Sequence, residues 1–156
     1  MTVTFASWDP GGSATLRTTG LVLWDEYAIP VDMMELNQEE FDKKMSGGLP
    51  NTIKEFIVEE YKPYGHINHT GNKLTTAQRI GDIKGYARRN GISVTEVPAN
   101  CKVIAAAWAQ VRLERDRRTG KIKHLPDWQA AYLVGYWKLF NDGLIRPKVL
   151  DRKKND

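Results

Sequence analysis

Three short apolar runs, separated by turn residues, open the chain. They predict strands over residues 3–8, 20–24 and 27–34. Pro30 interrupts the third run, and a proline cannot donate a hydrogen bond within a central ladder, so we expect this strand at an edge of a sheet. Asp9-Pro10-Gly11-Gly12 follows the first run as a turn, which favours a hairpin-like start.

The rest of the chain alternates between helical and extended patterns. Residues 75–90 repeat apolar side chains at helical spacing, Thr75 and Gln78 resemble a capping box, and Asn90-Gly91 marks the end. The other predicted elements, in chain order, are a polar helix at 38–45, a short strand at 56–58, a strand at 92–97, a helix at 102–113, a charged loop at 114–123 and an apolar helix at 126–141.

The order of these elements predicts an α/β fold. Three strands are followed by helix, strand, helix, strand, helix and helix, and the later strands are separated by crossovers, so the sheet should be mixed and flanked by helices. A chain of 156 residues fits a single core. We therefore expect one domain over residues 1–145 and a basic tail over residues 146–156.

Composition excludes several protein classes. Hydrophobic residues make up 41% and charged residues 27% of the chain, as in ordinary globular domains rather than disordered or rod-like chains. Cys101 is the only cysteine, which excludes an intrachain disulfide framework and fits a reducing compartment. No apolar run approaches the ~18 residues of a membrane span, and the first residues lack the pattern of a signal peptide. We therefore expect a soluble, cytoplasmic protein with no membrane partner.

Charge is distributed unevenly along the chain. Residues 1–60 contain eleven acidic and four basic side chains, whereas residues 61–156 contain nineteen basic and eight acidic ones. A basic surface beside an acidic cluster suits an enzyme that holds a polyanion with one region and metal ions with the other. Charge alone does not choose between nucleic-acid binding and a solvated basic face.

Four side chains form a candidate metal-binding set. Asp9 and Glu59 each follow a strand-like run, and ligands of open α/β sheets bind beyond the carboxyl ends of strands. His124 and Asp127 are three residues apart at the start of a helix and so share one face. Carboxylates and an imidazole suit Mg²⁺ or Mn²⁺, and two ions ~3.5–4 Å apart would activate water and stabilise the departing oxygen of a phosphodiester. Singly, each signal also fits a turn, a solvated strand end or a surface histidine.

These residues resemble the RuvC-type Holliday junction resolvases. Ser7-Trp8-Asp9-Pro10-Gly11 followed by Gly20-Leu21-Val22 resembles the opening of that family, and Ile57-Val58-Glu59-Glu60 is similar to its second acidic strand. Thr76-Ala77-Gln78-Arg79-Ile80-Gly81 resembles its glycine-containing helix. His124 to Asp127 with Ala130-Ala131 is similar to its terminal motif, in the version where the first acid is histidine. The motifs follow the family's order over most of the chain.

The resemblance implies an RNase H-like fold with a mixed five-stranded sheet, a homodimer, and metal-dependent nicking of four-way DNA junctions by paired symmetrical cuts, in recombination and repair. Asp9, Glu59, His124 and Asp127 match the metal-binding positions, for two ions of Mg²⁺ or Mn²⁺. Lys102 matches a basic residue near the scissile phosphate. The partner implied is branched DNA, and no small-molecule cofactor is implied.

The chain also departs from the family. Residues 13–19 exceed its tight turn, Trp128-Gln129 replaces its small residues, and residues 35–51 match poorly, which suggests a divergent, viral member. A replication-fork or flap endonuclease of the same fold is the closest alternative, followed by a noncatalytic nucleic-acid-binding domain. A sugar-kinase-like or actin-like nucleotide phosphatase needs a second phosphate loop and a second domain, which 156 residues hardly accommodate.

Basic residues of the second half are candidates for contacts with the DNA backbone, because neutralising phosphates supplies most nonspecific affinity. They are Arg88, Arg89, Arg115, Arg117, Arg118, Lys121, Lys123 and the basic tail. Each is also compatible with solubility alone.

Overall fold

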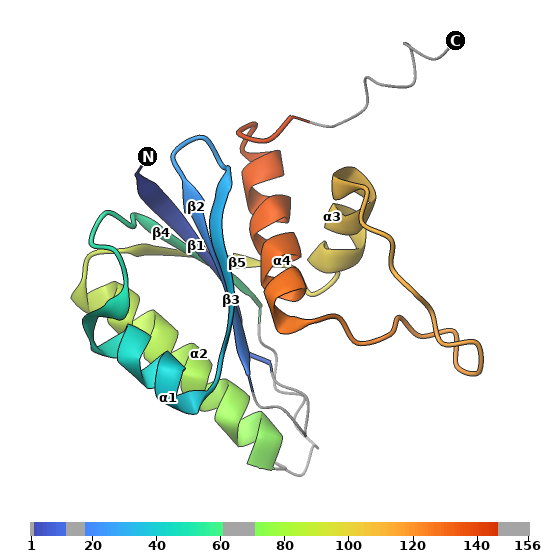
Figure 1. The fold of residues 1–156 in the computed structure, drawn as a ribbon, viewed down its shortest axis with the longest axis horizontal. Helices are drawn as coiled ribbons and strands as arrows, with labels where there is room; N and C mark the ends of the chain where they lie inside the picture. The colour runs from blue at the N-terminus through green and yellow to red at the C-terminus, as the bar shows by residue number, and fades with distance from the viewer. Residues whose placement is uncertain (1, 12–17, 61–70, 147–156) are drawn as a thin grey trace.

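The computed structural model describes residues 2–11, 18–60 and 71–146. These residues form a five-stranded sheet with the strand order β3-β2-β1-β4-β5 (Figure 1). The strands are β1 (Val3–Asp9), β2 (Thr19–Asp25), β3 (Pro30–Leu36), β4 (Glu55–Glu59) and β5 (Ser93–Val97). The pairs β1–β2 and β2–β3 are antiparallel, whereas β1–β4 and β4–β5 are parallel. The prediction of a mixed five-stranded α/β sheet is confirmed.

Helices cover both faces of this sheet (Figure 1). One face is covered by α1 (Gln38–Lys43), its π-helical continuation η1 (Lys44–Gly48) and α2 (Gly71–Arg89). The other face is covered by α3 (Cys101–Ala109) and α4 (Asp127–Asn141). Within the described residues, no helix is long and apolar enough to cross a membrane.

Alternation along the strands separates two hydrophobic cores. Successive strand side chains point to opposite faces, so neighbouring residues enter different cores. Trp8 and Phe56 pack on the side of α1 and α2, whereas Trp24 and Ile57 pack on the side of α3 and α4. Glu59 follows Ile57 by two positions, so its side chain faces α3 and α4 at the carboxyl end of the sheet.

Two glycines let α4 lie close to the sheet. A Cβ atom on Gly135 would lie 2.6 Å from Ser7 Oγ, and one on Gly20 would lie 1.9 Å from the backbone oxygen of Asp127. Ser7 Oγ donates a hydrogen bond to the backbone oxygen of Ala131 (2.7 Å), which ties α4 to β1. This close approach brings the first residue of α4, Asp127, to the end of the sheet where β1 finishes.

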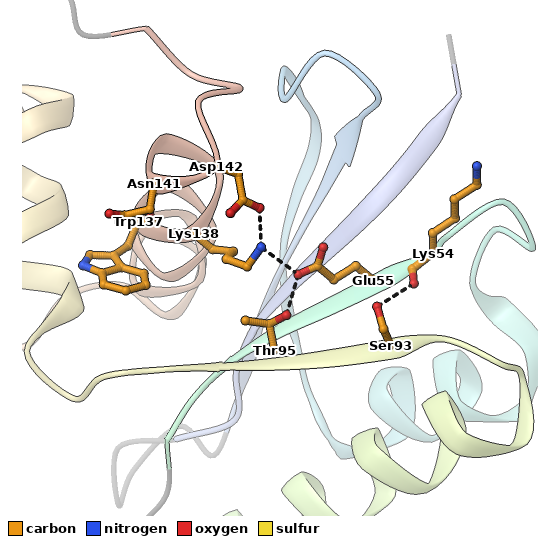
Figure 2. A network of polar contacts seen from close by, with 8 residues as sticks. All are labelled: Lys54, Glu55, Ser93, Thr95, Trp137, Lys138, Asn141 and Asp142. Carbon is orange, nitrogen blue, oxygen red and sulfur yellow. Dashed lines mark hydrogen bonds and ion pairs between the residues drawn. The ribbon is translucent and has the colours of Figure 1, made fainter.

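A polar network fixes the other end of α4. Figure 2 shows Lys138 of α4 beside Glu55 of β4, with Nζ to Oε2 at 3.3 Å, and Thr95 of β5 donating a hydrogen bond to the same carboxylate (2.6 Å). Lys138 also pairs with Asp142, one helical turn further along. Because Glu55 begins the strand that Glu59 ends, the helix is held at both ends of the sheet.

The third strand is displaced from its expected position. It spans Pro30–Leu36 instead of residues 27–34, because Tyr27 lies in the turn that joins it to β2. Asp25 Oδ1 shapes that turn by accepting hydrogen bonds from the backbone N–H groups of Tyr27 (2.9 Å) and Ile29 (3.0 Å). The expectation that this proline-containing strand lies at an edge is confirmed.

Two helix boundaries also differ from the prediction. The predicted start of the helix at Thr75 is wrong, because α2 begins at Gly71 and Thr75 lies inside it. A complete capping box occurs instead at the start of α1, where the side chains and backbone N–H groups of Asn37 and Glu40 bond reciprocally (2.9 and 3.2 Å). The helix predicted to reach residue 113 ends at Ala109, because Gln110 adopts a left-handed conformation with φ of 58°.

The charged segment 114–123 is not a simple loop, because Arg115 and Ile122 form an antiparallel bridge across it. The apolar helix expected over 126–141 is confirmed as α4. Residues 147–156 of the expected basic tail, and most of the long turn expected at 13–19, lie outside the described residues.

Candidate active site

Asp9 ends β1 at the carboxyl edge of the sheet. The residue is 9% exposed, and its Oδ1 accepts a hydrogen bond from the backbone N–H of Gly11 (3.2 Å). Burial raises the pKa of Asp9 to about 6; the Lys102 ammonium lowers it, and the carboxylates of Asp127 and Glu59 raise it. An ionised carboxylate in this position is destabilised unless a cation lies beside it.

Glu59 ends β4, the parallel neighbour of β1. Ser7 pairs with Ile57 in the register of these strands, and both side chains face α3 and α4. Two residues further on, Asp9 and Glu59 therefore reach the same face at the ends of adjacent strands. Glu60 lies just beyond β4 and extends the ladder by one backbone hydrogen bond to Val97, and strand alternation predicts that its side chain points away from that of Glu59.

Lys102 lies in the first turn of α3 and pairs with Glu59, with Nζ to Oε2 at 2.9 Å. The amino end of a helix carries a partial positive charge that repels a cation, so the ammonium of Lys102 must be stabilised by other groups. Burial alone would lower the pKa of Lys102, but the Asp9 and Glu59 carboxylates outweigh burial and raise it. Lys102 is therefore a permanent cation at neutral pH, in a position that neutralises two carboxylates.

Asp127 is buried, with 4% of its surface exposed. Its Oδ2 accepts a hydrogen bond from Thr18, whereas Oδ1 is buried and has no hydrogen-bond partner among the described residues. Burial raises the pKa of Asp127, while the Thr18 hydrogen bond and His124 lower it. The largely exposed imidazole of His124 places Nε2 at 3.9 Å from Asp127 Oδ1. A buried carboxylate oxygen without a donor is the kind of atom that a bound ion would satisfy.

Two cavities meet at Asp9 and Lys102, which line both of them. The larger, of about 600 Å³, is also lined by Glu59, by Glu60 and by residues of α2 and of the β5–α3 connection. The smaller, of about 250 Å³, is also lined by His124 and by the residues just before it. The two cavities therefore share one wall, which is formed by Asp9 at the end of β1 and Lys102 of α3.

The predicted site residues fall into two groups. Asp9, Glu59 and Lys102 lie together, and His124 lies beside Asp127, with Asp9 close enough to both groups to have its pKa changed by each. In the part of the chain that the structure describes, no three or more Asp, Glu, His or Cys side chains lie close enough to hold a single metal ion as they stand. The four predicted ligands therefore surround a region, without converging on one point.

Sequence reasoning missed Thr18, which bonds Asp127 from just before β2. The two residues are 109 positions apart, and a threonine before a strand gives no local signal of such a contact. Next to Lys102, the thiol of Cys101 is buried, and burial raises its pKa to about 12, which keeps it protonated at neutral pH.

Comparisons with known proteins agree with this architecture at the level of the fold. No protein-family model matches the sequence, and no curated protein matches it either. A structure of T. thermophilus RuvC in complex with a Holliday junction substrate is similar to this chain, with a TM-score of 0.58 and 12% identity over 92% of this chain and 98% of that chain. The chain has the RuvC fold. A second Thermus thermophilus RuvC structure matches with a TM-score of 0.52 and 13% identity over the same shares of the two chains.

Within this fold, three of the predicted site residues lie at the ends of strands or at the start of a helix. Asp9 and Glu59 stand at the ends of the first and fourth strands, and Asp127 begins the last helix. The resemblance to RuvC is thus confirmed for the fold. At 12–13% identity, the structural likeness extends no further than that.

Proposed function

We propose that this chain is a metal-dependent endonuclease that resolves four-way DNA junctions by paired nicks. The observation that supports this most strongly is the pair of carboxylates, Asp9 and Glu59, on one face at the ends of adjacent parallel strands, with Lys102 bound to Glu59. The RuvC structure with the higher TM-score was solved with a Holliday junction substrate, which supports the same choice of substrate.

The donor atoms fit divalent ions of the Mg²⁺ or Mn²⁺ type. Asp9, Glu59 and Asp127 provide hard oxygen donors, and His124 adds a nitrogen donor. A cation would relieve both the unpaired Oδ1 of Asp127 and the destabilised carboxylate of Asp9. Because the ligands lie in two groups, we propose two ions, one held by Asp9 and Glu59 and the other by Asp127 and His124. Such ions supply an activated water and stabilise charge on the departing oxygen.

Lys102 acts as a charged contact for the phosphate. Its raised pKa keeps it protonated, so it cannot serve as a general base. Its ammonium instead neutralises Asp9 and Glu59 while the site is free of DNA and turns to a phosphate oxygen when the backbone enters. Thr18 holds Asp127 through Oδ2 and leaves Oδ1 directed to a ligand.

Paired symmetrical nicks require two such sites. One chain carries one set of these residues, so a homodimer with twofold symmetry is the simplest assembly that cuts opposite strands of a junction. The excess of basic residues after residue 60 provides the surface that holds the DNA arms.

A replication-fork or flap endonuclease would use the same site on another branched substrate. The two functions separate when end-labelled four-way, three-way and flapped DNA of matched sequence are digested with Mg²⁺ or Mn²⁺. We expect the four-way junction to be cut fastest, with paired products. Preferential cutting of the flap would favour the alternative, and metal-independent binding without any nick on the three substrates would favour a noncatalytic domain.

A further inference from the structure

The segment between α3 and α4 contains a paired β-hairpin, residues 114–123, which we term the basic hairpin. The backbone N–H of Lys123 donates to the oxygen of Glu114 (2.7 Å), and that of Asp116 donates to the oxygen of Lys121 (2.8 Å). An antiparallel bridge joins Arg115 and Ile122. Figure 1 shows this segment extending away from the sheet, beyond α3 and α4. The basic hairpin is thus an element with its own backbone pairing.

Asp116 orders the tip of the basic hairpin. Its Oδ1 accepts hydrogen bonds from the backbone N–H groups of Arg118 (2.7 Å) and Thr119 (3.2 Å). Gly120 donates its N–H to the backbone oxygen of Asp116 (2.9 Å) and has a φ of +69°, which glycine adopts at little cost. Arg115 Nη1 donates to the oxygen of Gly120 (2.9 Å) and closes the turn from the other side.

The basic hairpin is strongly positive. Its ten residues include five basic and two acidic side chains, and all five basic residues are exposed: Arg115, Arg117, Arg118, Lys121 and Lys123. The carboxylate of Asp116 is used by backbone N–H groups, and that of Glu114 lies 3.5 Å from Lys123 in an exposed pair that contributes little. The tip therefore presents Arg117 and Arg118 to solvent on a preformed turn.

The base of the basic hairpin belongs to the candidate active site. Ile122, Lys123 and His124 line the 250 Å³ cavity together with Asp9 and Lys102. From His124 to Gly120 the chain spans four residues, at most ~13 Å at ~3.3 Å per residue. This reach is about the ~12 Å width of a DNA major groove. The tip of the basic hairpin thus lies no further from His124 than about the width of a major groove, which is short enough for one duplex arm to contact both the cavity at Asp9 and the arginines of the tip.

We propose that the basic hairpin binds the phosphate backbone of the duplex arm next to the cleavage position, and that Asp116 is required because it shapes the tip. This inference rests on the proposed nuclease function and adds to it a DNA-binding element. Guanidinium groups bind phosphate oxygens in bidentate fashion. A preformed turn presents them without the cost of ordering the loop on binding.

Two substitutions at Asp116 separate shape from charge. Asp116→Asn and Asp116→Ala remove the same negative charge, but only asparagine keeps an oxygen that accepts the two N–H bonds. We expect Asp116→Asn to bind an end-labelled four-way junction, in EDTA, at least as tightly as wild type. We expect Asp116→Ala to bind about tenfold more weakly, the factor for ordering about one residue. Amide exchange at Arg118 and Thr119 should be faster in the alanine variant alone.

A second comparison counts the phosphate contacts. In Arg117→Ala/Arg118→Ala, the slope of log affinity against log salt should fall by ~1.8, so that between 50 and 200 mM salt this variant loses ~12-fold less affinity than wild type. Arg117→Lys/Arg118→Lys should keep the wild-type slope. Lys43→Ala/Lys44→Ala, which removes two positive charges from the distant α1 and η1, is the matched control and should also keep it.

The outcomes separate this proposal from the nuclease function. Equal affinities of the two Asp116 variants, or a wild-type slope in the arginine-to-alanine variant, would overturn the role of the basic hairpin even where wild type nicks the junction. Hairpin-dependent binding without any nicking would support the basic hairpin and contradict the nuclease function. A wild-type chain that binds neither duplex nor branched DNA, or prefers duplex RNA at equal salt, would overturn the proposal.

Discussion

Replacing Asp9 by asparagine should stabilise the protein while removing its activity. The carboxylate is buried at the end of β1, where Asp127 and Glu59 add like charges. Asparagine has nearly the same shape, keeps an oxygen for the Gly11 N–H, and carries no charge. Lys102 is not left unpaired by the change, because it stays bound to Glu59.

The magnitude follows from the pKa of Asp9, which burial raises from 3.8 to about 6. At about 1.4 kcal/mol per pH unit, the ionised form costs the folded state about 3 kcal/mol. The pKa of Asp9 is higher in the folded than in the unfolded chain, so protonated Asp9 favours folding. This contribution to wild-type stability is fully present below pH ~4 and is lost as pH rises through ~6. Asp9→Asn should therefore be more stable than wild type by about 3 kcal/mol at pH 8, and the difference should vanish near pH 4.

Urea and thermal unfolding at pH 4, 5, 6 and 8 measure this difference. For a domain of this size, about 3 kcal/mol corresponds to a rise in Tm of roughly 6–12 °C at pH 8. Adding Mg²⁺ or Mn²⁺ should stabilise wild type but not Asp9→Asn, since a ligand of the folded state raises stability by mass action. A stability difference that is independent of pH, or an asparagine variant less stable than wild type at pH 8, would refute the reasoning.

Three further predictions concern the other site residues and the packing of α4. Glu59→Gln should reduce nicking by orders of magnitude and leave junction binding intact, whereas Glu60→Gln should retain most activity; the reverse result would show that the wrong glutamate is assigned. His124→Asp should shift the metal preference from Mn²⁺ toward Mg²⁺, because Mg²⁺ prefers oxygen donors to nitrogen, and an unchanged metal preference would contradict a role of His124 as a ligand. Gly135→Ala, whose Cβ would lie 2.6 Å from a buried hydroxyl, should lower the free energy of unfolding by about 1–3 kcal/mol. Gly81→Ala, whose Cβ meets nothing within 4 Å, should raise it by up to about 1 kcal/mol; equal effects at the two glycines would contradict the packing account.

The sheet was predictable because its signals are local. A proline within a strand excludes a central position whatever the rest of the fold, so Pro30 by itself indicates an edge strand. The apolar runs that become β1, β2 and β4 are bounded by turn residues or charged residues. Helix ends were less predictable. Thr75 has the spacing of a capping residue, yet α2 runs through it, because a capping pattern inside a longer helix costs little and tertiary contacts decide the boundary.

The site was predictable only in part. Asp9, Glu59 and Asp127 follow strands or begin a helix, so their positions at one end of the sheet follow from the order of elements. Thr18 and the close approach of Gly20 to Asp127 depend on how α4 crosses β2, which only the folded chain determines. The hairpin turn at Asp116 has a local signal, Asp followed by Thr119-Gly120, but the dense basic charge around it is equally typical of a solvated loop.

The proposed function requires that the acidic end of the sheet cuts branched DNA with the help of a divalent ion. An immobile four-way junction, with each strand end-labelled in turn, tests this when it is incubated with wild type and with Asp9→Asn, in EDTA and in Mg²⁺ or Mn²⁺. We expect nicks at symmetrical positions in two opposite strands, only for wild type and only with a divalent ion, while both proteins bind the junction equally. The absence of nicks under every metal condition, or equal cutting by Asp9→Asn, would contradict the claim.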